Sequence, residues 1–162
     1  MKNNKAVGLD AIPNELYKYA PQNIIIFMSL TFNAFFNHSF LPDVLMNVLI
    51  VPLLKGKYKD PSNSGNYRPI AIATSASKIF ESLVYERIKD YLKTTDNQFG
   101  FKLHHSTDLC IYTLKEVVSY YRCLNTPIYL CFVDIKSAFD RVSYWKLLIK
   151  LIDRGIPLII VL

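Results

Sequence analysis

The chain has 162 residues, about the size of one domain and long enough to bury a core. Hydrophobic residues make up 51% of it and the mean hydropathy is +0.18, which excludes an intrinsically disordered chain and predicts some uncovered apolar surface. The net charge of +6 and the pI near 9.2 indicate an anionic partner, but alone they support nucleic acid only weakly.

No targeting segment, membrane span or cysteine pairing is expected. Residues 24–36 are the longest apolar stretch, but they include polar residues and are shorter than the roughly 20 residues that cross a bilayer, so we expect a buried helix. Residues 1–5 do not begin a secretory signal, which predicts a cytoplasmic or nuclear protein without a membrane partner. The cysteines match no zinc spacing and are expected as reduced thiols in the core: Cys110, Cys123 and Cys131.

The first half of the chain predicts two helices and then two strands. A short helix over residues 13–20 starts at a proline, and a longer helix follows Pro21 to about residue 38. Residues 48–54 and 67–73 are rich in Val, Ile and Leu, and a segment of lysines and turn formers separates them. Each strand contains a proline, which cannot donate to a ladder, so we expect an edge hairpin that projects into solvent.

The second half predicts three helices and one strand. Residues 77–93 form the clearest amphipathic pattern, and a helix over 108–122 is expected to begin after Ser106 or Thr107 as its N-cap. Residues 128–133 are apolar on both faces, as in the central strand of a covered sheet. After a helix over 144–154, capped by Ser143, the chain stops within another apolar run, so we expect part of a longer protein. The irregular order favours an α+β fold.

Asp134 directly follows the predicted strand, and Asp140 comes six residues later. A carboxylate at the end of a buried strand is unfavourable unless it is paired or binds a cation. Mg²⁺ suits such a position, because it takes one or two carboxylates and completes its shell with water and phosphate oxygens. The alternative is an aspartate that caps the next turn. These residues alone leave both possibilities open.

Four segments together carry a family resemblance. They are KAVGLDAIPNELYK at residues 5–18, a segment at 50–81 that contains N-Y-R-P-I, NQFGF at 97–101 and FVDIKSAFDRV at 132–142. In this order and spacing they resemble the N-terminal motif, fingers hairpin, Q-F-G-F segment and first catalytic palm motif of the reverse transcriptases of non-LTR retrotransposons, the jockey-like and LINE-type elements. One motif would be a weak signal, whereas four in order are a strong one.

The resemblance implies an incomplete right-hand polymerase domain over nearly the whole chain. Its expected parts are an N-terminal motif at about 1–20, a fingers hairpin at 48–73, a helical fingers and palm region at 77–123 and the start of the palm at 128–162. The family activity is RNA-directed DNA synthesis with Mg²⁺ ions, an RNA template, a DNA primer and deoxynucleoside triphosphates.

The resemblance also implies roles for single residues. Asp134 aligns with the first catalytic aspartate, and the backbone carbonyl of Ile135 is the expected second ligand to the metal. Asp140 matches the motif, but we expect it to cap a helix or pair with Arg141 or Lys146. The residues expected to contact the incoming nucleotide are Lys55, Arg68 and Phe139. Those expected to shape the template and nucleotide site are Gln98, Gly100 and Phe101.

The sequence departs from the family pattern in two places. After Lys102, where relatives carry a glycine and a basic residue, this chain has His104 and His105, which weakens phosphate binding and removes a flexible turn. A metal site at this histidine pair would lack a third ligand nearby. The family also needs a downstream Asp-Asp pair, and none occurs in the 162 residues. We therefore expect the chain alone not to polymerise. The alternatives are a non-catalytic nucleic-acid-binding module and a degenerate remnant without a stable fold.

Overall fold

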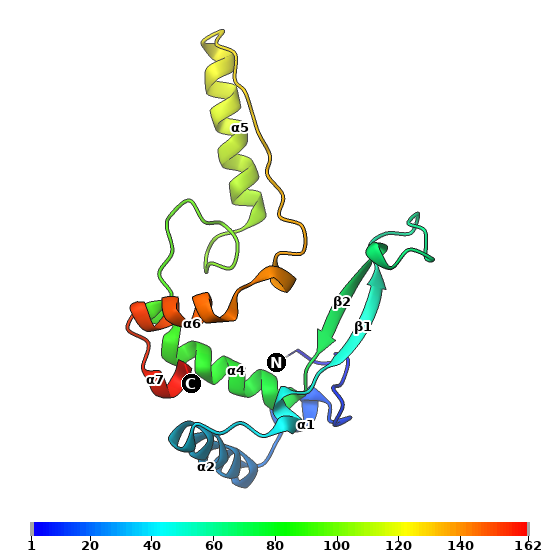
Figure 1. The fold of residues 1–162 in the computed structure, drawn as a ribbon, viewed down its shortest axis with the longest axis vertical. Coiled ribbons are helices and arrows are strands. Elements are labelled where there is room, and N and C mark those ends of the chain that lie inside the picture. The colour runs from blue at the N-terminus through cyan, green and yellow to red at the C-terminus, as the bar shows by residue number, and fades with distance from the viewer. Residues whose placement is uncertain (1, 162) are drawn as a thin grey trace. The chain divides into compact units, whose positions relative to one another are not determined.

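The computed structural model describes residues 2–161 and divides into two compact units (Figure 1). The first unit runs to Lys89 and resumes at Gly155, and the second runs from Asp90 to Arg154. Helices and one small sheet occur together in the described chain, which confirms the α+β class. The finer assignment to polymerase fingers and palm stays a prediction.

Prolines precede several helices of the first unit. Pro13, Pro21 and Pro42 are the extended N-cap residues of α1 (Asn14–Lys18), α2 (Gln22–His38) and α3 (Asp43–Met46). Proline suits a helix start because it disfavours the helical conformation in the residue before it and lacks an N–H. Both predicted helices of this region are confirmed, although Pro13 lies at the cap and not at the first helical position. The unit is completed by α4 (Ser75–Ile88) and α7 (Leu158–Val161).

The predicted hairpin is confirmed. Strands β1 (Leu49–Leu54) and β2 (Tyr67–Ile72) pair antiparallel, and in Figure 1 they extend away from the helices of their unit. Pro52 lies opposite Pro69. Because the Lys55 amide donates to the Asn66 carbonyl at 2.8 Å, alternation along the ladder makes the proline pair a non-hydrogen-bonded one. Neither proline therefore removes a ladder bond, which explains how both strands tolerate proline.

Aromatic rings of α2 and α4 form the apolar core of the first unit. Phe80 of α4 lies 5.3 Å from Phe32 and 5.0 Å from Phe36, measured between ring centroids. The guanidinium of Arg87 lies 3.8 Å from the Phe36 centroid, and its Nη2 donates to Asn33 at 3.3 Å. Among residues 2–161, the buried apolar side chains are Phe32, Phe36 and Ile156.

The expectation that residues 24–36 form a buried helix is confirmed for the helix but wrong for most of its burial. They lie within α2, but only the side of the helix that faces Phe80 is covered. The large apolar side chains of this stretch that are exposed are Ile24, Ile25, Ile26, Phe27 and Leu30. The cause is a lack of partners, since no other described helix or strand covers that side of α2 closely enough to bury it.

A buried polar cluster joins the N-terminal segment to the start of α4. The Ser75 hydroxyl donates to Asn14 Oδ1 at 2.7 Å, and the Ser77 hydroxyl donates to the Leu45 carbonyl at 2.6 Å. Thr74 caps α4 by accepting from the Ser77 amide at 3.2 Å. Within residues 2–161 no buried side-chain nitrogen or oxygen lacks a partner. The cluster therefore carries little desolvation cost.

Gly8 makes the close approach of the N-terminal segment possible. An added Cβ at Gly8 would lie 2.7 Å from Thr74 Cα and 2.9 Å from the Ala73 carbonyl carbon. Any side chain there would push the segment away from the backbone that begins α4. The sequence motif at residues 5–18 is thus explained in part by packing within this unit.

The second unit contains two longer helices and extended segments. A 3₁₀ turn at Lys89–Tyr91 includes the first two residues of this unit. Helix α5 (Thr107–Cys123) is capped by Ser106, one of the two expected caps, whose hydroxyl accepts from the Leu109 amide at 3.2 Å. A second 3₁₀ turn covers Phe139–Arg141, and α6 (Tyr144–Asp153) follows Ser143. Ser143 lies at the expected cap position, but its side chain forms no capping hydrogen bond.

The prediction of a buried central strand at residues 128–133 is wrong. None of residues 90–154 forms a strand, and this segment is extended chain with Tyr129 91% and Phe132 81% exposed. A strand that is apolar on both faces forms only when neighbouring strands bind its edges and other elements cover it. The second unit offers neither.

The expectation of core cysteines is also wrong in part. The three thiols are free, but Cys110, Cys123 and Cys131 are all exposed. Two lie on α5 and one on the extended segment, which gain no covering layer in their unit.

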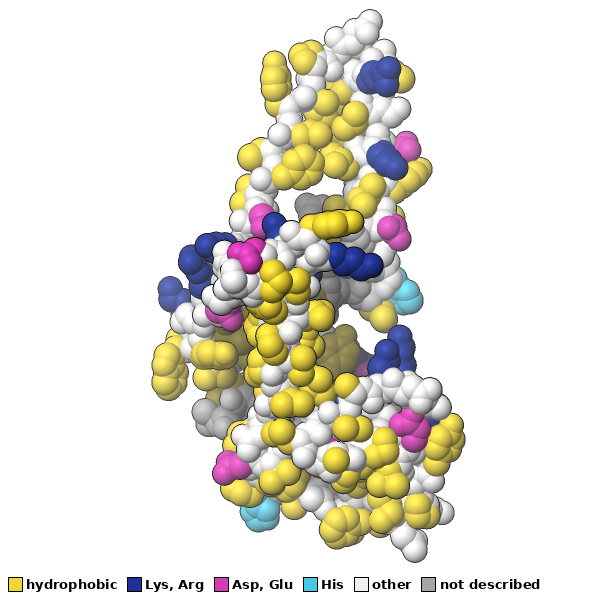
Figure 2. All heavy atoms as spheres, turned by 90° about the vertical axis from the view of Figure 1, so that its right-hand side faces the viewer, with side chains coloured by type: hydrophobic (Ala, Val, Ile, Leu, Met, Phe, Trp, Pro, Cys, Tyr) yellow, Lys and Arg dark blue, Asp and Glu magenta, His cyan; other side chains and the backbone are white. Residues whose placement is uncertain are grey.

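Much of the apolar surface is uncovered, as the hydropathy predicts. Large apolar side chains of both units are exposed, among them Phe27, Leu30, Phe40, Phe132 and Trp145. Figure 2 shows hydrophobic side chains over most of the face that it draws. No helix among residues 2–161 has both the length and the apolar character needed to span a membrane.

Candidate nucleotide and template site

The hairpin places the two expected nucleotide-binding cations on one face. Arg68 lies opposite Leu53, and Lys55 is two residues beyond Leu53 along the same strand direction. Opposed residues share a face and successive residues alternate, so Lys55 and Arg68 share a face near the tip. Both side chains are exposed. The Lys55 ammonium also donates to the Gly65 carbonyl at 2.8 Å, in the 3₁₀ turn Ser64–Asn66 that precedes β2.

The first part of the hairpin tip is a tight turn. The Lys59 amide donates to the Gly56 carbonyl at 3.2 Å, so Lys57 and Tyr58 occupy the two corner positions. Corner side chains of such a turn point away from its closing hydrogen bond. Tyr58 is accordingly fully exposed, at 102% of its reference area.

The second part of the tip is held by side-chain hydrogen bonds. The Ser62 amide and hydroxyl donate to the Asp60 carboxylate at 2.9 and 2.8 Å. The Asn66 amide group donates to the Asp60 carbonyl and the Tyr67 hydroxyl donates to the Pro61 carbonyl, each at 3.0 Å. The pKa of Asp60 is lowered mainly by the hydrogen bond from the Ser62 backbone N–H, and also by the hydrogen bond from the Ser62 hydroxyl. The returning half of the tip is therefore well defined.

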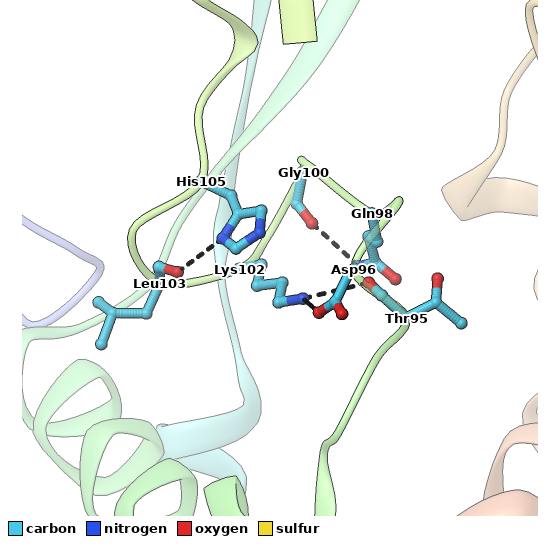
Figure 3. A network of polar contacts seen from close by, with 7 residues as sticks. All are labelled: Thr95, Asp96, Gln98, Gly100, Lys102, Leu103 and His105. Carbon is cyan, nitrogen blue, oxygen red and sulfur yellow. Dashed lines mark hydrogen bonds and ion pairs between the residues drawn. The ribbon is translucent and has the colours of Figure 1, made fainter. Parts of the chain in front are cut away.

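In the second unit, the Q-F-G-F segment folds into a local polar network (Figure 3). The Gln98 side chain donates to the Gly100 carbonyl at 2.9 Å. The Lys102 ammonium donates to the Thr95 carbonyl at 3.1 Å and lies 3.3 Å from Asp96 Oδ1. The side chains of Gln98 and Lys102 thus stabilise this turn. The side-chain nitrogen Nε2 of Gln98 is already used in a hydrogen bond within the chain.

Gly100 makes no close packing contact within the described chain. An added Cβ at Gly100 would meet nothing of that chain within 4 Å. The residues of this turn that adopt positive φ are instead Phe101 at 55° and His104 at 60°. His104 stands where the resemblance implies a glycine, and histidine is one of the side chains that tolerate this region.

Two expected site residues from distant positions lie together in the second unit. The rings of Phe101 and Phe139 meet edge to face, with centroids 6.4 Å apart and planes at 84°. Phe101 is 96% and Phe139 78% exposed, so the pair forms a surface and not a core. The expected template-shaping residue and the expected residue beneath the sugar are thereby neighbours.

Asp134 lies in the extended segment with its side chain exposed, not at the end of a buried strand. The Asp134 carboxylate therefore has no burial cost that a cation must offset, and only the motif supports a metal there. Asp140 lies within the second 3₁₀ turn, and no ion pair links it to Arg141 or Lys146 among residues 2–161.

The residues present do not by themselves form a metal site. Residues 2–161 contain no group of three or more His, Cys, Asp or Glu side chains placed to hold one ion. One carboxylate and one carbonyl are too few protein ligands for Mg²⁺ in the absence of substrate phosphates. No catalytic step through a metal can therefore be derived from this chain alone.

Two features have no counterpart among the expected site residues. Tyr58 is fully exposed between two lysines, and the alternation of lysine and aromatic residues in KYK is the sequence signal that could have marked it. The polar cluster of Asn14, Thr74, Ser75 and Ser77 is the second, and its signal is the serine-rich start of α4.

The hairpin cations, the Q-F-G-F turn and the Asp134 motif thus occur in one chain, and comparison with known proteins assigns them to a class. The profile of the family described as "Reverse transcriptase (RNA-dependent DNA polymerase)" matches residues 56–161, more than half of the chain. The chain belongs to this family.

Named relatives narrow the class. The chain is 33% identical over 156 residues to "Probable RNA-directed DNA polymerase from transposon X-element" of Drosophila melanogaster. It is 32% identical over 157 residues to "RNA-directed DNA polymerase from mobile element jockey" of Drosophila funebris. These alignments cover 92% and 93% of this chain but 17% of each relative. They confirm the resemblance to the reverse transcriptases of non-LTR retrotransposons.

Proposed function

We propose that this chain supplies the nucleotide-binding hairpin and the first metal-binding aspartate of an RNA-directed DNA polymerase. The observation that carries the proposal is the placement of Lys55 and Arg68 on one face of an exposed hairpin. A guanidinium can bind two phosphate oxygens at once, and a lysine adds a second positive charge. Such a pair suits the triphosphate of an incoming deoxynucleotide.

The second unit would contribute to the sugar and the template. The edge-to-face pair of Phe101 and Phe139 offers an apolar surface on which a sugar can rest. A bulky ring at Phe139 would exclude a ribose 2′-hydroxyl by steric contact. Gln98 and Gly100 lie in the turn that carries Phe101, so their proposed role is to hold that ring in place.

Asp134 is proposed as one carboxylate ligand of the Mg²⁺ site in a longer enzyme that acts on an RNA template and a DNA primer. Bound Mg²⁺ would supply charge neutralisation for the triphosphate. The other carboxylates are not among the residues of this sequence, which has no Asp-Asp pair. The 162-residue chain is therefore proposed to be inactive by itself.

Triphosphate binding tests the hairpin directly. Adding a deoxynucleoside triphosphate should shift the backbone amide resonances of Lys55 and Arg68 in the 162-residue chain. Arg68→Ala should remove most of this shift, and Arg68→Lys should restore it only in part because bidentate contact is lost. Arg122→Ala, in the second unit, is the matched control. A shift that survives Arg68→Ala unchanged would contradict the assignment of the hairpin.

Primer extension tests the role of Asp134. The 162-residue chain should give no DNA synthesis on an RNA template. A longer polypeptide that carries this sequence and an Asp-Asp motif should extend the primer, and Asp134→Asn should abolish extension while template binding changes little, because the carboxylate acts on the transition state. Synthesis by the short chain, or by the longer Asp134→Asn variant, would overturn the proposal.

A further inference from the structure

The turn at the hairpin tip contains three consecutive residues that the proposed function does not use. They are Lys57, Tyr58 and Lys59, and together they are called the tip platform. We propose that Tyr58 stacks on a base of single-stranded RNA while Lys57 and Lys59 contact the flanking phosphates. The inference rests on the proposed function, which it deepens by naming a contact for the single-stranded template beside the nucleotide-binding cations.

The turn geometry presents the side chains of Lys57 and Tyr58 outward. Lys57 and Tyr58 are the corner residues of the turn closed by the Lys59 amide and the Gly56 carbonyl. Tyr58 is fully exposed, so both faces of its ring are open to a ligand. A base stacks on an aromatic ring without regard to its identity, because every base has a π-face. An accessible ring between two cations is the arrangement that single-strand binders use.

The segment that follows the tip platform, residues 60–67, is held by hydrogen bonds. The hydrogen bonds from Ser62 and Asn66 to Asp60, and from Tyr67 to Pro61, hold the returning half of the tip. The Lys55 ammonium joins the two halves through Gly65. An ordered segment reduces the conformational entropy lost when a ligand binds, and so favours affinity from a small surface.

Charge is concentrated on this hairpin. Residues 49–72 contain four cations, Lys55, Lys57, Lys59 and Arg68, and one carboxylate, that of Asp60. The resulting charge of +3 is half the +6 of the whole chain within 24 of its 162 residues. The Asp60 carboxylate also accepts hydrogen bonds from Ser62, which directs it into the loop. The positive potential at the tip therefore favours a polyanion.

Exposure alone does not select this site. Tyr129, in the second unit, is 91% exposed, but its neighbours in sequence are Ile128 and Leu130. Tyr129 therefore has a ring without cations next to it in sequence, and Lys115 on α5 is an exposed cation whose neighbours in sequence are Leu114 and Glu116. A duplex is the less suitable partner, since its bases are already stacked on one another. The platform is matched to a single strand.

Fluorescence anisotropy with a labelled single-stranded RNA of about 12 nucleotides tests the inference on the 162-residue chain. Tyr58→Ala should weaken binding by about 5- to 100-fold and leave the salt dependence unchanged, because it removes stacking and no charge. Tyr58→Phe should bind like the original chain, since the ring is kept. Lys57→Ala with Lys59→Ala should reduce the slope of log affinity against log salt by about 0.7 for each lost phosphate contact.

Tyr129→Ala and Lys115→Ala are the matched controls and should leave binding unchanged. Backbone amide spectra of each variant show whether the hairpin remains folded. Equal affinity of Tyr58→Ala and the original chain for the single strand, or tighter binding of duplex than of single-stranded RNA, would overturn the inference. So would an absence of binding at about 50 mM salt. These results leave the proposed function standing, because triphosphate shifts at Arg68 do not require Tyr58.

Discussion

The two units contain similar apolar segments but bury them very differently. In the first unit Phe32 of α2 is 6% exposed, because Phe80 of α4 lies against it. In the second unit Trp145 of α6 is 79% exposed, although α6 has the more strongly amphipathic sequence. The difference shows that hydrophobicity decides which side chains can be buried, whereas an opposing element decides which ones are.

Polar contacts follow the same division. In the first unit Ser75 and Asn14 are buried and bonded across 61 positions of sequence. In the second unit the network around Lys102 spans 7 positions and remains exposed. Long-range buried hydrogen bonds hold a tertiary arrangement, whereas short-range ones hold only a turn. Substitutions should therefore perturb stability strongly in the first unit and weakly in the second.

Truncation of one phenylalanine in each unit should give the largest contrast. Phe80→Ala removes the ring that meets Phe32, Phe35 and Phe36, and should lower the free energy of unfolding of the first unit by about 3 kcal/mol. Phe101→Ala removes an exposed ring and should cost the second unit less than about 0.5 kcal/mol. Hydrogen exchange of peptides from each unit measures both. Equal losses would contradict the comparison.

Helices and the hairpin could be predicted because their signals are local. Pro21 before the apolar run of α2, and Ser106 before α5, mark helix starts whatever surrounds them. The strand at residues 128–133 could not be predicted correctly, because strand formation depends on partners that a local pattern does not reveal. The burial of the cysteines and of the whole of α2 was predicted wrongly for the same reason, because burial also depends on partners that a local pattern does not reveal.

The sequence predicted those residues of the candidate site that belong to a recognisable motif. The motifs name Lys55 and Arg68, and the hairpin register then places them on one face. The neighbouring rings of Phe101 and Phe139 come from positions 38 residues apart, and no periodicity links them. The left-handed conformation of His104 was signalled only by the departure from a family glycine.

A glycine in each unit gives a smaller contrast. Gly8→Ala would place a Cβ 2.7 Å from Thr74 Cα, so the N-terminal segment must shift, at a cost of about 2 kcal/mol to the first unit. Gly100→Ala would meet nothing of the described chain within 4 Å and should be nearly neutral. Faster amide exchange at Ser77, whose N–H bonds Thr74, would report the first effect. Unchanged exchange at Ser77 in Gly8→Ala would show that the segment is not held there.

The smallest expected effect is a gain of stability in the second unit. His104 has φ of 60°, a conformation that costs a side chain energy but costs glycine little. His104→Gly should therefore stabilise the turn before α5 by about 0.5 kcal/mol, since the lost strain exceeds the added backbone entropy. Leu103→Gly is the control, because Leu103 is not among the positive-φ residues and should lose stability through entropy alone.

Amide exchange of His105, whose N–H donates to the Lys102 carbonyl at 3.3 Å, reports on this turn. His104→Gly should slow this exchange and Leu103→Gly should quicken it. Residues of the first unit should show no change in either variant, because the turn contributes nothing to their core. If both variants quicken exchange at His105, His104 is not strained in this turn. Replacing it by glycine then cannot stabilise the second unit.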